Sequence, residues 1–290
     1  MQLLETHIAK KQEKSIRFQE YGVGIFNTVS TKSAIKKAIK KELIFIDGIL
    51  ATTSKFISGG EKIKLYQSEK NSSFKRLKLD LEVLYEDDFL AIINKPAGVL
   101  VSGNKFVTIT NALPQNLQKS TQKDAVKPQP IHRLDYPTSG LLLVGKTSSA
   151  IQRLSLLFKK KQIQKTYYAI TIGSMCDAAI IHFKVNNKNA STKFKVLQSV
   201  KSERFKYLNL VELQPKTGRK HQLRKHLSSI GHQILGDTIY GKSDLILKGK
   251  GLYLHASKLE FEHPITSENI IIFKEFPKKF TRIFKHIKTN

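Results

Sequence analysis

The chain has 290 residues, 40% of them apolar, and a formal net charge of +27 from 50 Lys and Arg against 23 Asp and Glu. This length suits one large domain or two unequal ones. The charge favours a polyanionic partner, above all nucleic acid, because each cation placed on a phosphate releases counterions. The N-terminus lacks a signal-peptide core and no apolar run is long enough to span a bilayer, so we expect no membrane partner.

The first quarter of the chain is predicted to form a small basic unit. Residues 1–19 are polar, and we expect an extension with a loose start. Residues 31–41 carry apolar residues at helical spacing, with Ser30 or Thr31 as N-cap. The other face of this helix is basic and contains Lys32, Lys36, Lys37 and Lys40. Asp47-Gly48 then predicts a hairpin turn, residues 56–66 a turn and closing strand, and residues 67–78 a linker.

A second domain is predicted for residues 79–290, with more strands than helices. Helices are expected at 108–117, 148–161 and 217–230, on the sides of a mixed, mostly antiparallel sheet. Residues 118–130 are predicted to be a polar loop. The fold class is therefore α+β, with a small N-terminal α/β domain in front.

A polar, turn-rich segment, residues 131–140, runs straight into the apolar run 141–144, which is predicted to be a buried strand. Pro137 fixes its own φ, and Gly140 permits backbone angles that other residues resist. Asp135 is therefore predicted to lie on a stiff loop at a strand edge, as a reactive side chain requires. An ordinary surface ion pair on a turn is the alternative.

Metal and disulfide chemistry is not expected. Cys176 is the single cysteine, which excludes an internal disulfide and fits a reducing cytoplasm. His221, His226 and His232 do not share one helix face, so we expect helix-surface or RNA-facing residues and no metal site. Only eight of the 50 basic residues are Arg. Three of these, Arg133, Arg219 and Arg224, lie in the two densest polar motifs, where a planar guanidinium suits a fixed geometry.

Four segments resemble the RluA-type pseudouridine synthases: INKPAGVLVSGN (93–104), HRLDYPTSGLLLVGKT (132–147), KTYYA (165–169) and TGRKHQLRKHLSSIGHQILGDTIYG (217–241). The resemblance covers nearly all of residues 79–280. Residues 20–66 resemble the S-four-like RNA-binding domain of a small-subunit ribosomal protein. The resemblance implies a cofactor-free enzyme that isomerises uridine in RNA, ribosomal RNA before transfer RNA, and a monomer is the default.

The resemblance also implies roles for single residues. Asp135 is the family's catalytic aspartate, which either attacks the sugar or assists loss of its proton. Arg224 matches the arginine that pairs with this aspartate and keeps it ionised and oriented. Tyr167 matches a tyrosine beside the target base, although Tyr168 is its neighbour and alternation places the two on opposite faces.

Further residues are expected to contact RNA. Arg133 matches a residue that helps to push the target nucleotide out of its stack. Lys95 and Arg219 either support the site or touch phosphates. Leu223 is expected in the apolar wall over the base, Lys220 on the RNA, and the lysines of the N-terminal helix on structured RNA.

Two other classes of function compete with the enzyme. A non-catalytic RNA-binding or ribosome-assembly factor would retain the same fold. Residues 236–243 satisfy the P-loop string G-x-x-x-x-G-K-S. A P-loop follows a buried strand and opens a helix, whereas here a basic helix precedes the string. Nucleotide binding is therefore not expected.

Overall fold

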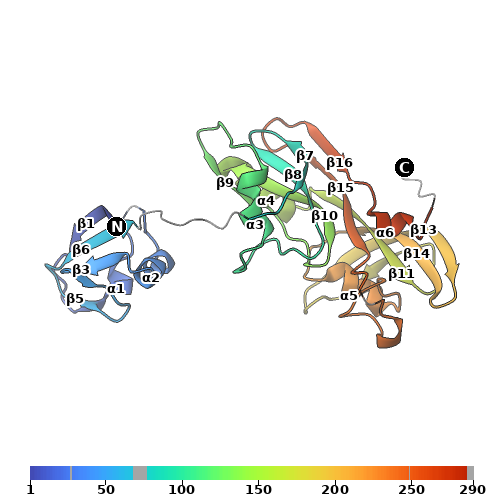
Figure 1. Cartoon of the computed structure of the whole chain (residues 1–290), viewed down its shortest axis with the longest axis horizontal. Coiled ribbons are helices and arrows are strands. Elements are labelled where there is room, and N and C mark those ends of the chain that lie inside the picture. Colours follow the sequence, from blue (N-terminus) through green and yellow to red (C-terminus); the bar gives the residue numbers. More distant parts are fainter. Residues whose placement is uncertain (27, 68–76, 248, 286–290) are drawn as a thin grey trace. The chain divides into compact units, whose positions relative to one another are not determined.

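A computed structural model describes the chain except for residues 27, 68–76, 248 and 286–290. The chain divides into two compact units, Met1–Lys75 and Arg76–Asn290 (Figure 1). Most of the predicted linker 67–78 lies outside the described residues. None of the helices in the described part of the chain is long and apolar enough to cross a membrane.

The N-terminal unit is built on a four-stranded antiparallel sheet with strand order β1-β6-β3-β4. Its elements are β1 (Gln2–Ile8), β2 (Ile16–Arg17), α1 (Phe18–Tyr21), α2 (Lys32–Lys40), β3 (Ile44–Ile46), β4 (Ile49–Leu50), β5 (Phe56–Ile57) and β6 (Lys62–Gln67). The expectation of a loose start is wrong, because β1 pairs with β6. None of the β1 side chains is fully buried, so the backbone ladder holds this strand and leaves no apolar pattern in the sequence.

Helix α2 and the hairpin that follows have the local chemistry their residues predict. The Thr31 hydroxyl caps the helix by accepting the Ala34 amide at 3.2 Å. Ile35 and Ala38 are buried, while the predicted lysines lie on the exposed side. Asp47 and Gly48 turn the hairpin with φ of 50° and 84°, the left-handed pair that a two-residue hairpin loop requires.

The C-terminal unit has one ten-stranded sheet, and the prediction of a mixed, mostly antiparallel sheet is confirmed. Its main path runs β12-β13-β14-β11-β15-β10-β8-β7, with β16 on β15 and β9 on β10. The strands are β7 (Glu82–Glu86), β8 (Leu90–Lys95), β9 (Ala125–Pro130), β10 (Ser139–Thr147), β11 (Gln164–Ile172), β12 (Ala178–His182), β13 (Ser191–Ser202), β14 (Lys206–Pro215), β15 (Leu254–Glu262) and β16 (Asn269–Phe273). The helices are α3 (Ile109–Asn116), α4 (Ser148–Lys159), α5 (Gln222–Ser229) and α6 (Lys278–Thr281), with a short 3-10 turn at Ser243–Leu245.

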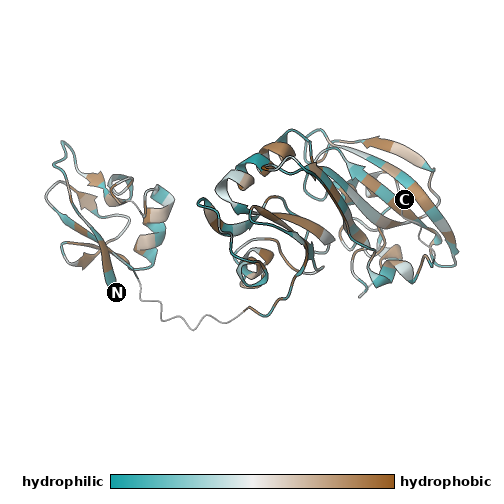
Figure 2. Cartoon of the chain, turned by 90° about the horizontal axis from the view of Figure 1, so that it is seen from above, coloured by the Kyte–Doolittle hydropathy of each residue, from teal (hydrophilic) through white to brown (hydrophobic). Residues whose placement is uncertain are grey.

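Alternation along β8 and β10 divides the core into layers. Ile93 and Leu142 face α3, whereas Ile92 and Leu143 face the side where Leu154 of α4 packs. A further apolar cluster joins β11 and β14 to α5 and α6. Figure 2 shows brown, hydrophobic stretches and teal, hydrophilic stretches along the strands of the chain. Both faces of the sheet centre are thus covered, so the strands have a rigid packing environment.

Two segments differ from the expected elements. The polar loop 118–130 contains β9, whose prolines lie in a strand outside the main path of the sheet. The helix expected at 217–230 begins only at Gln222. His221 adopts a left-handed conformation with φ of 57°, and the Gln222 side-chain oxygen accepts from the Thr217 hydroxyl and the Arg219 amide at 2.7 and 3.1 Å. Residues 217–221 therefore form a structured loop.

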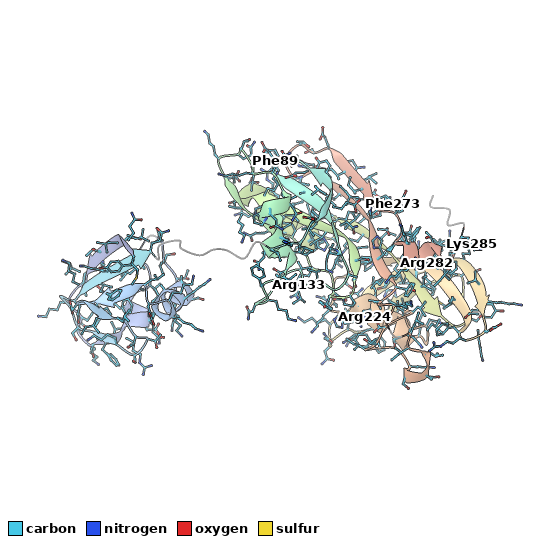
Figure 3. All side chains as sticks on the ribbon, viewed as in Figure 1. Phe89, Arg133, Arg224, Phe273, Arg282 and Lys285 are labelled. Carbon is cyan, nitrogen blue, oxygen red and sulfur yellow. The ribbon has the colours of Figure 1, made fainter. Side chains whose placement is uncertain are left out.

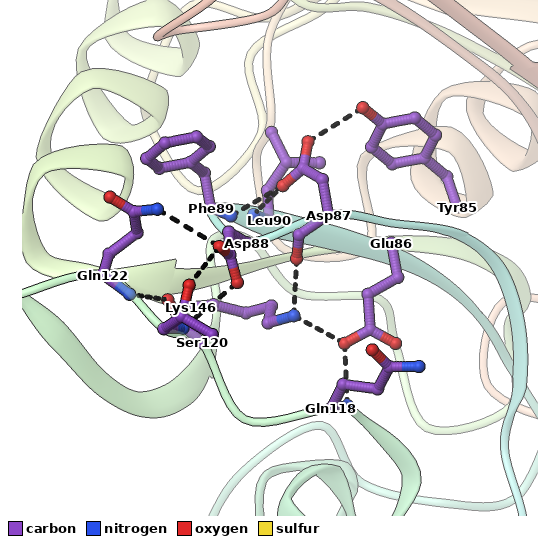
Figure 4. Close-up of polar contacts among 11 residues, drawn as sticks. Tyr85, Glu86, Asp87, Asp88, Phe89, Leu90, Gln118, Ser120, Gln122 and Lys146 are labelled. Atoms are coloured by element: carbon purple, nitrogen blue, oxygen red, sulfur yellow. Dashed lines mark hydrogen bonds and ion pairs between the residues drawn. The ribbon is translucent and has the colours of Figure 1, made fainter.

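The far end of β10 is fixed by a buried lysine. The Lys146 ammonium donates to Glu86 Oε1 at 2.6 Å and to the Asp87 carbonyl (Figure 4). The same Glu86 oxygen accepts the Gln118 amide at 2.8 Å. This network ties the C-terminal end of β10 to the turn between β7 and β8, whereas the polar loop 131–138 precedes the opposite end of β10.

The two halves of the sheet join through a very short parallel contact. Strands β10 and β15 pair only at Ser139 with His255 and at Gly140 with Ala256. The Ser139 hydroxyl also lies 2.8 Å from Nδ1 of His255. Gly140 has φ of +115°, and a Cβ there would lie 2.2 Å from the Ala256 carbonyl oxygen. The loop that carries Asp135 thus ends at the point where the halves meet.

We expect Gly140→Ala to disrupt the pairing of β10 with β15 and to lower the free energy of unfolding. Gly103 is the matched control, because it also has a positive φ of +143° but open space around its Cβ position. Gly103→Ala should cost about 1 to 3 kcal/mol of unfolding free energy from backbone strain. Gly140→Ala should cost clearly more, because the methyl group also collides with the Ala256 backbone. Urea denaturation of both variants measures the difference, and equal costs would contradict a steric role for Gly140.

Candidate active site

A cleft of about 710 Å³ opens at the end of β10 where the two halves of the sheet meet. Its walls come from the loop 131–138, from β11 and from residues 215–223. Val101, Leu223 and Leu254 contribute apolar surface to it. Asp135 is the one acidic residue among the described residues that line this cleft. The lining therefore combines one carboxylate with apolar side chains and several cations.

The Asp135 carboxylate remains partly accessible inside this cleft. Its side chain is 27% exposed, and the nearest ionisable partner is His221, whose Nε2 lies 3.7 Å from Oδ1. The Thr138 amide donates to the Asp135 carbonyl at 3.0 Å and closes a turn beneath the side chain. The backbone at Asp135 is thus fixed while its oxygens stay available to a ligand.

Lys95, at the end of β8, anchors this loop from the inside. Its side chain is fully buried, and its ammonium donates to the carbonyls of Pro96, Tyr136 and Thr138 at 2.8, 3.3 and 2.7 Å. Of the two roles left open for Lys95, support of the site is the one the structure shows, and its assignment as an RNA contact is wrong. Burial lowers the pKa of Lys95 to about 8, against the opposing effect of Asp135.

Strand β11 directs the two neighbouring tyrosines apart. Tyr167 lines the cleft, whereas Tyr168 is buried, packs against Phe276, and donates its hydroxyl to Glu212 at 3.2 Å. Burial, followed by the charge of Asp135, raises the pKa of Tyr167. Tyr167 is therefore a neutral phenol at physiological pH, and the negative charge of Asp135 disfavours its deprotonation.

The Arg224 guanidinium pairs with Asp237. Both side chains are buried, and Nε and Nη2 of Arg224 donate to the two carboxylate oxygens at 2.7 and 2.6 Å. The prediction that Arg224 pairs with Asp135 is wrong for this structure, since the fork is occupied by another acid. Figure 3 labels Arg224 on α5 and Arg133 on the loop before β10. Burial acts against the charge of Arg224, but Asp237 and then Asp135 raise its pKa.

The His221 ring lies between Asp135 and Tyr240. Its Nδ1 lies 2.8 Å from the Tyr240 hydroxyl and its other ring nitrogen faces Asp135. The Tyr240 ring in turn lies under the Arg224 guanidinium, 5.1 Å from its centre. Burial lowers the pKa of His221, although Asp135 opposes this effect. The ring is therefore largely neutral at pH 7, and it forms a hydrogen bond with the Tyr240 hydroxyl.

The other predicted RNA contacts fall into two groups. Arg133, Arg219, Lys220 and Leu223 line the cleft, and the three cations are exposed. Lys32, Lys36, Lys37 and Lys40 are exposed on α2 of the N-terminal unit, where Lys32 forms an ion pair with Glu20. The four residues of the C-terminal unit thus line the same cleft as Asp135.

Sequence reasoning missed the role of Asp237. This residue lies in the P-loop string, where its Oδ1 accepts the amides of Ile239 and Tyr240, both at 3.0 Å. The loop amides that would hold a phosphate in a P-loop are therefore bound by the loop's own carboxylate. A 3-10 turn follows, where a P-loop would open an α-helix. His226, expected at the surface, is buried and contacts Thr192.

The chain is similar to known proteins over most of its length. Residues 89–229 match the family model described as RNA pseudouridylate synthase. The chain is 30% identical over 284 residues to ribosomal large subunit pseudouridine synthase D of Nitrosomonas europaea, covering 89% of this chain and 80% of the relative. The chain belongs to the RluA-type family of RNA pseudouridine synthases.

Two further relatives define the range of the family. The chain is 32% identical over 237 residues to tRNA pseudouridine synthase C of Vibrio vulnificus, covering 72% of this chain and 96% of the relative. The solved structure of human RNA pseudouridylate synthase domain containing 4 superposes with a TM-score of 0.57 at 27% identity, covering 70% of this chain and 92% of that one. The pseudouridine synthase fold and isomerase class are therefore those of this protein.

Asp237→Asn is expected to destabilise the synthase strongly. The substitution leaves the buried Arg224 guanidinium without its charged partner, which costs about 3 to 5 kcal/mol. Asp244→Asn is the matched control, because Asp244 is exposed and has no ion pair in the described structure. Urea denaturation measures both variants. A loss no larger than that of the control would show that the Arg224–Asp237 pair does not hold α5 in place.

The depressed pKa of Lys95 predicts a pH-dependent contribution to stability. Because the folded-state pKa of about 8 lies below the ordinary value of 10.5, folding disfavours the proton on Lys95. The free energy of unfolding of the wild type should therefore rise relative to that of Lys95→Met between pH 8 and 10, by up to about 1.4 kcal/mol per pH unit. Below pH 8 the difference should be constant. The exposed Lys105→Met is the control, and a flat difference for Lys95→Met from pH 8 to 10 would refute the assignment.

Proposed function

We propose that this protein converts uridine to pseudouridine in ribosomal RNA, with Asp135 as its catalytic carboxylate. The observation that carries the proposal is the lone Asp135 carboxylate in a cleft with apolar walls. The reaction breaks the bond from ribose C1′ to N1 of uracil, turns the base, and joins C1′ to C5. The proton lost from C5 balances the proton gained at N1, so substrate and product are isomers.

One carboxylate distinguishes this chemistry from hydrolysis. Glycoside hydrolases use a pair of acids, one for the leaving group and one for water or the sugar. Among the described residues that line this cleft, Asp135 is the only acid. Leu223 and Leu254 add apolar surface beside it, which favours exclusion of water while the base is detached. Asp135 either attacks C1′ or assists loss of a sugar proton, and both roles need the carboxylate in its ionised form.

Tyr167 and Arg224 support this carboxylate in different ways. Tyr167 lies on the cleft wall as a neutral phenol, suited to stack on uracil and to take part in the proton transfer at C5. Arg224 is held by Asp237 and supplies positive potential near Asp135, without a direct ion pair in this state. Arg224 is therefore a positioning residue here.

RNA binding involves both units. Arg133 is exposed at the cleft and can fill the gap that a flipped nucleotide leaves in its stack. Arg219 and Lys220 are exposed there too and can bind phosphates. The S-four-like N-terminal unit grips structured RNA through Lys32, Lys36, Lys37 and Lys40. Ribosomal RNA is favoured over transfer RNA by this unit and by the similarity to the ribosomal large subunit pseudouridine synthase of Nitrosomonas europaea. The protein acts as a monomer in the cytoplasm and needs no cofactor.

Asp135→Asn tests the proposal. Ribosomal RNA from a strain lacking the protein is incubated with wild type, with Asp135→Asn, or with the control Asp80→Asn, whose side chain is exposed outside the cleft. Pseudouridines are mapped by carbodiimide modification. We expect Asp135→Asn to lose at least about 10³-fold in rate, within the range of a lost acid–base group, with the Kd for RNA changed less than about threefold. Wild-type protein that binds RNA but forms no pseudouridine would instead indicate a non-catalytic RNA-binding factor.

A further inference from the structure

A second, smaller groove of about 280 Å³ adjoins the cleft. It lies between the end of α4, the start of β11 and the segment that follows β14. Five cations line it and no acidic residue does: Lys159, Lys161, Lys165, Lys216 and Arg219. The groove is thus a concave surface of one charge sign, and such surfaces concentrate anions.

The five cations have no ion-pair partner in the described part of the chain. The Arg219 Nε donates only to the Asn189 carbonyl, at 3.3 Å. The Lys165 ammonium lies 5.5 Å from the centre of the Phe158 ring, and burial lowers its pKa. A half-buried lysine without a counter-charge costs folding free energy, so this arrangement points to a ligand that supplies the negative charge.

The groove is continuous with the active-site cleft. Both are lined by Phe158, Lys165, Pro215, Thr217, Gly218 and Arg219. Lys165 and Tyr167 are two residues apart on β11 and both line the cleft, so their side chains point the same way. Their Cα atoms are about 7 Å apart along the strand. A phosphate bound to the ribose of a uridine beside Tyr167 can therefore reach Lys165.

The centre of the Phe158 ring lies 5.5 Å from the Lys165 ammonium and 4.9 Å from the centre of the His132 ring, so both residues contact Phe158. His132 begins the motif that carries Asp135, and its Nε2 accepts the Leu143 amide at 3.1 Å. This bond keeps Nε2 unprotonated. Burial, followed by the charge of Lys165, lowers the pKa of His132 to about 3. The ammonium of Lys165 is thus close enough to the motif for a bound phosphate to be placed relative to Asp135.

We propose that this groove binds the phosphate backbone of the RNA strand that flanks the target nucleotide, with Lys165 on the phosphate next to it. The inference rests on the proposed function and adds a subsite for a flanking nucleotide. Single-stranded RNA is the class of ligand, because a flipped nucleotide and its neighbours leave the duplex. Lys159, Lys161 and Lys216 are exposed and form the outer part of the groove.

The test neutralises this outer part and leaves the cleft intact. The variant is Lys159→Gln/Lys161→Gln/Lys216→Gln. The matched control is Lys119→Gln/Lys123→Gln/Lys127→Gln, three exposed lysines that line neither cavity. Both triples are also made with Asp135→Asn, so that RNA binding is measured without turnover. The probe for binding is labelled ribosomal RNA from the strain lacking the protein, followed by anisotropy between 50 and roughly 300 mM salt.

The groove triple should reduce the slope of log K against log salt by about 2, the value for three contacts to single-stranded phosphates at about 0.7 each. Its KM should rise at least about tenfold, while kcat changes less than about twofold. The control triple should change both slope and KM much less. Equal effects of the two triples would overturn the groove as an RNA site.

A modified substrate separates failure of the groove from failure of the proposed function. A methylphosphonate next to the mapped uridine removes one phosphate charge. It should weaken binding to Asp135→Asn protein, and weaken it much less when Lys165→Met is added to that protein. If wild type forms pseudouridine and this coupling is absent, the subsite is rejected and the proposed function stands. If wild type forms no pseudouridine, the proposed function fails, and the assignment of a target nucleotide fails with it.

Discussion

Three carbonyl oxygens of the segments around Asp135 converge on the buried ammonium of Lys95, and the site depends on this contact. A lysine without an acidic partner is costly to bury, and here hydrogen bonds to Pro96, Tyr136 and Thr138 offset the cost. The ammonium fixes the backbone at two of the three residues that follow Asp135. Among the described residues the Asp135 carboxylate has no Lys or Arg within ion-pair distance, and its side chain is 27% exposed, so its oxygens remain accessible to a substrate.

The cations of the candidate active site fall into two groups, one buried and one exposed. Arg224 forms a buried ion pair with Asp237, and the pair fixes α5 against the loop 236–240. Lys95 meets backbone dipoles, whereas Arg133, Arg219 and Lys220 are exposed at the cleft. Buried cations thus hold the framework, and exposed cations are left for the polyanion. Loss of a buried cation should alter stability first, whereas loss of an exposed one should alter RNA affinity and its salt dependence.

Local chemistry made part of the structure predictable from the sequence. The cap at Thr31, the Asp47-Gly48 turn and the helix at 148–159 follow from short-range preferences, and the order of apolar runs gave a mostly antiparallel sheet. Strand β1 escaped prediction because none of its side chains is fully buried, and a backbone ladder leaves no periodic signal. The start of α5 was placed too early because Gln222 ties the preceding residues into a loop.

The cleft-lining residues of the candidate site were named from their motifs, but the supporting roles of Asp237 and His221 were not predicted. Asp237 follows Arg224 by 13 residues and lies beyond the end of α5, so only the folded loop brings its carboxylate back to the Arg224 guanidinium. The same holds for His221, whose left-handed backbone turns its ring toward Asp135 and Tyr240. Motif matching assigns a chemical role to each residue type, whereas burial decides which partner satisfies it, and burial is a property of the whole fold.

The electrostatics of the cleft impose an order on a bound strand. Asp135 is negative and repels phosphates, so the backbone of the target nucleotide cannot lie over it. The ribose and base are uncharged and can approach the carboxylate, while the phosphates on either side must lie near cations. The unpaired lysines beside β11 provide such a position next to Tyr167. In the proposed reaction, Asp135 therefore has a second role beside its part in breaking the glycosidic bond, because its charge also selects the part of the nucleotide that faces it.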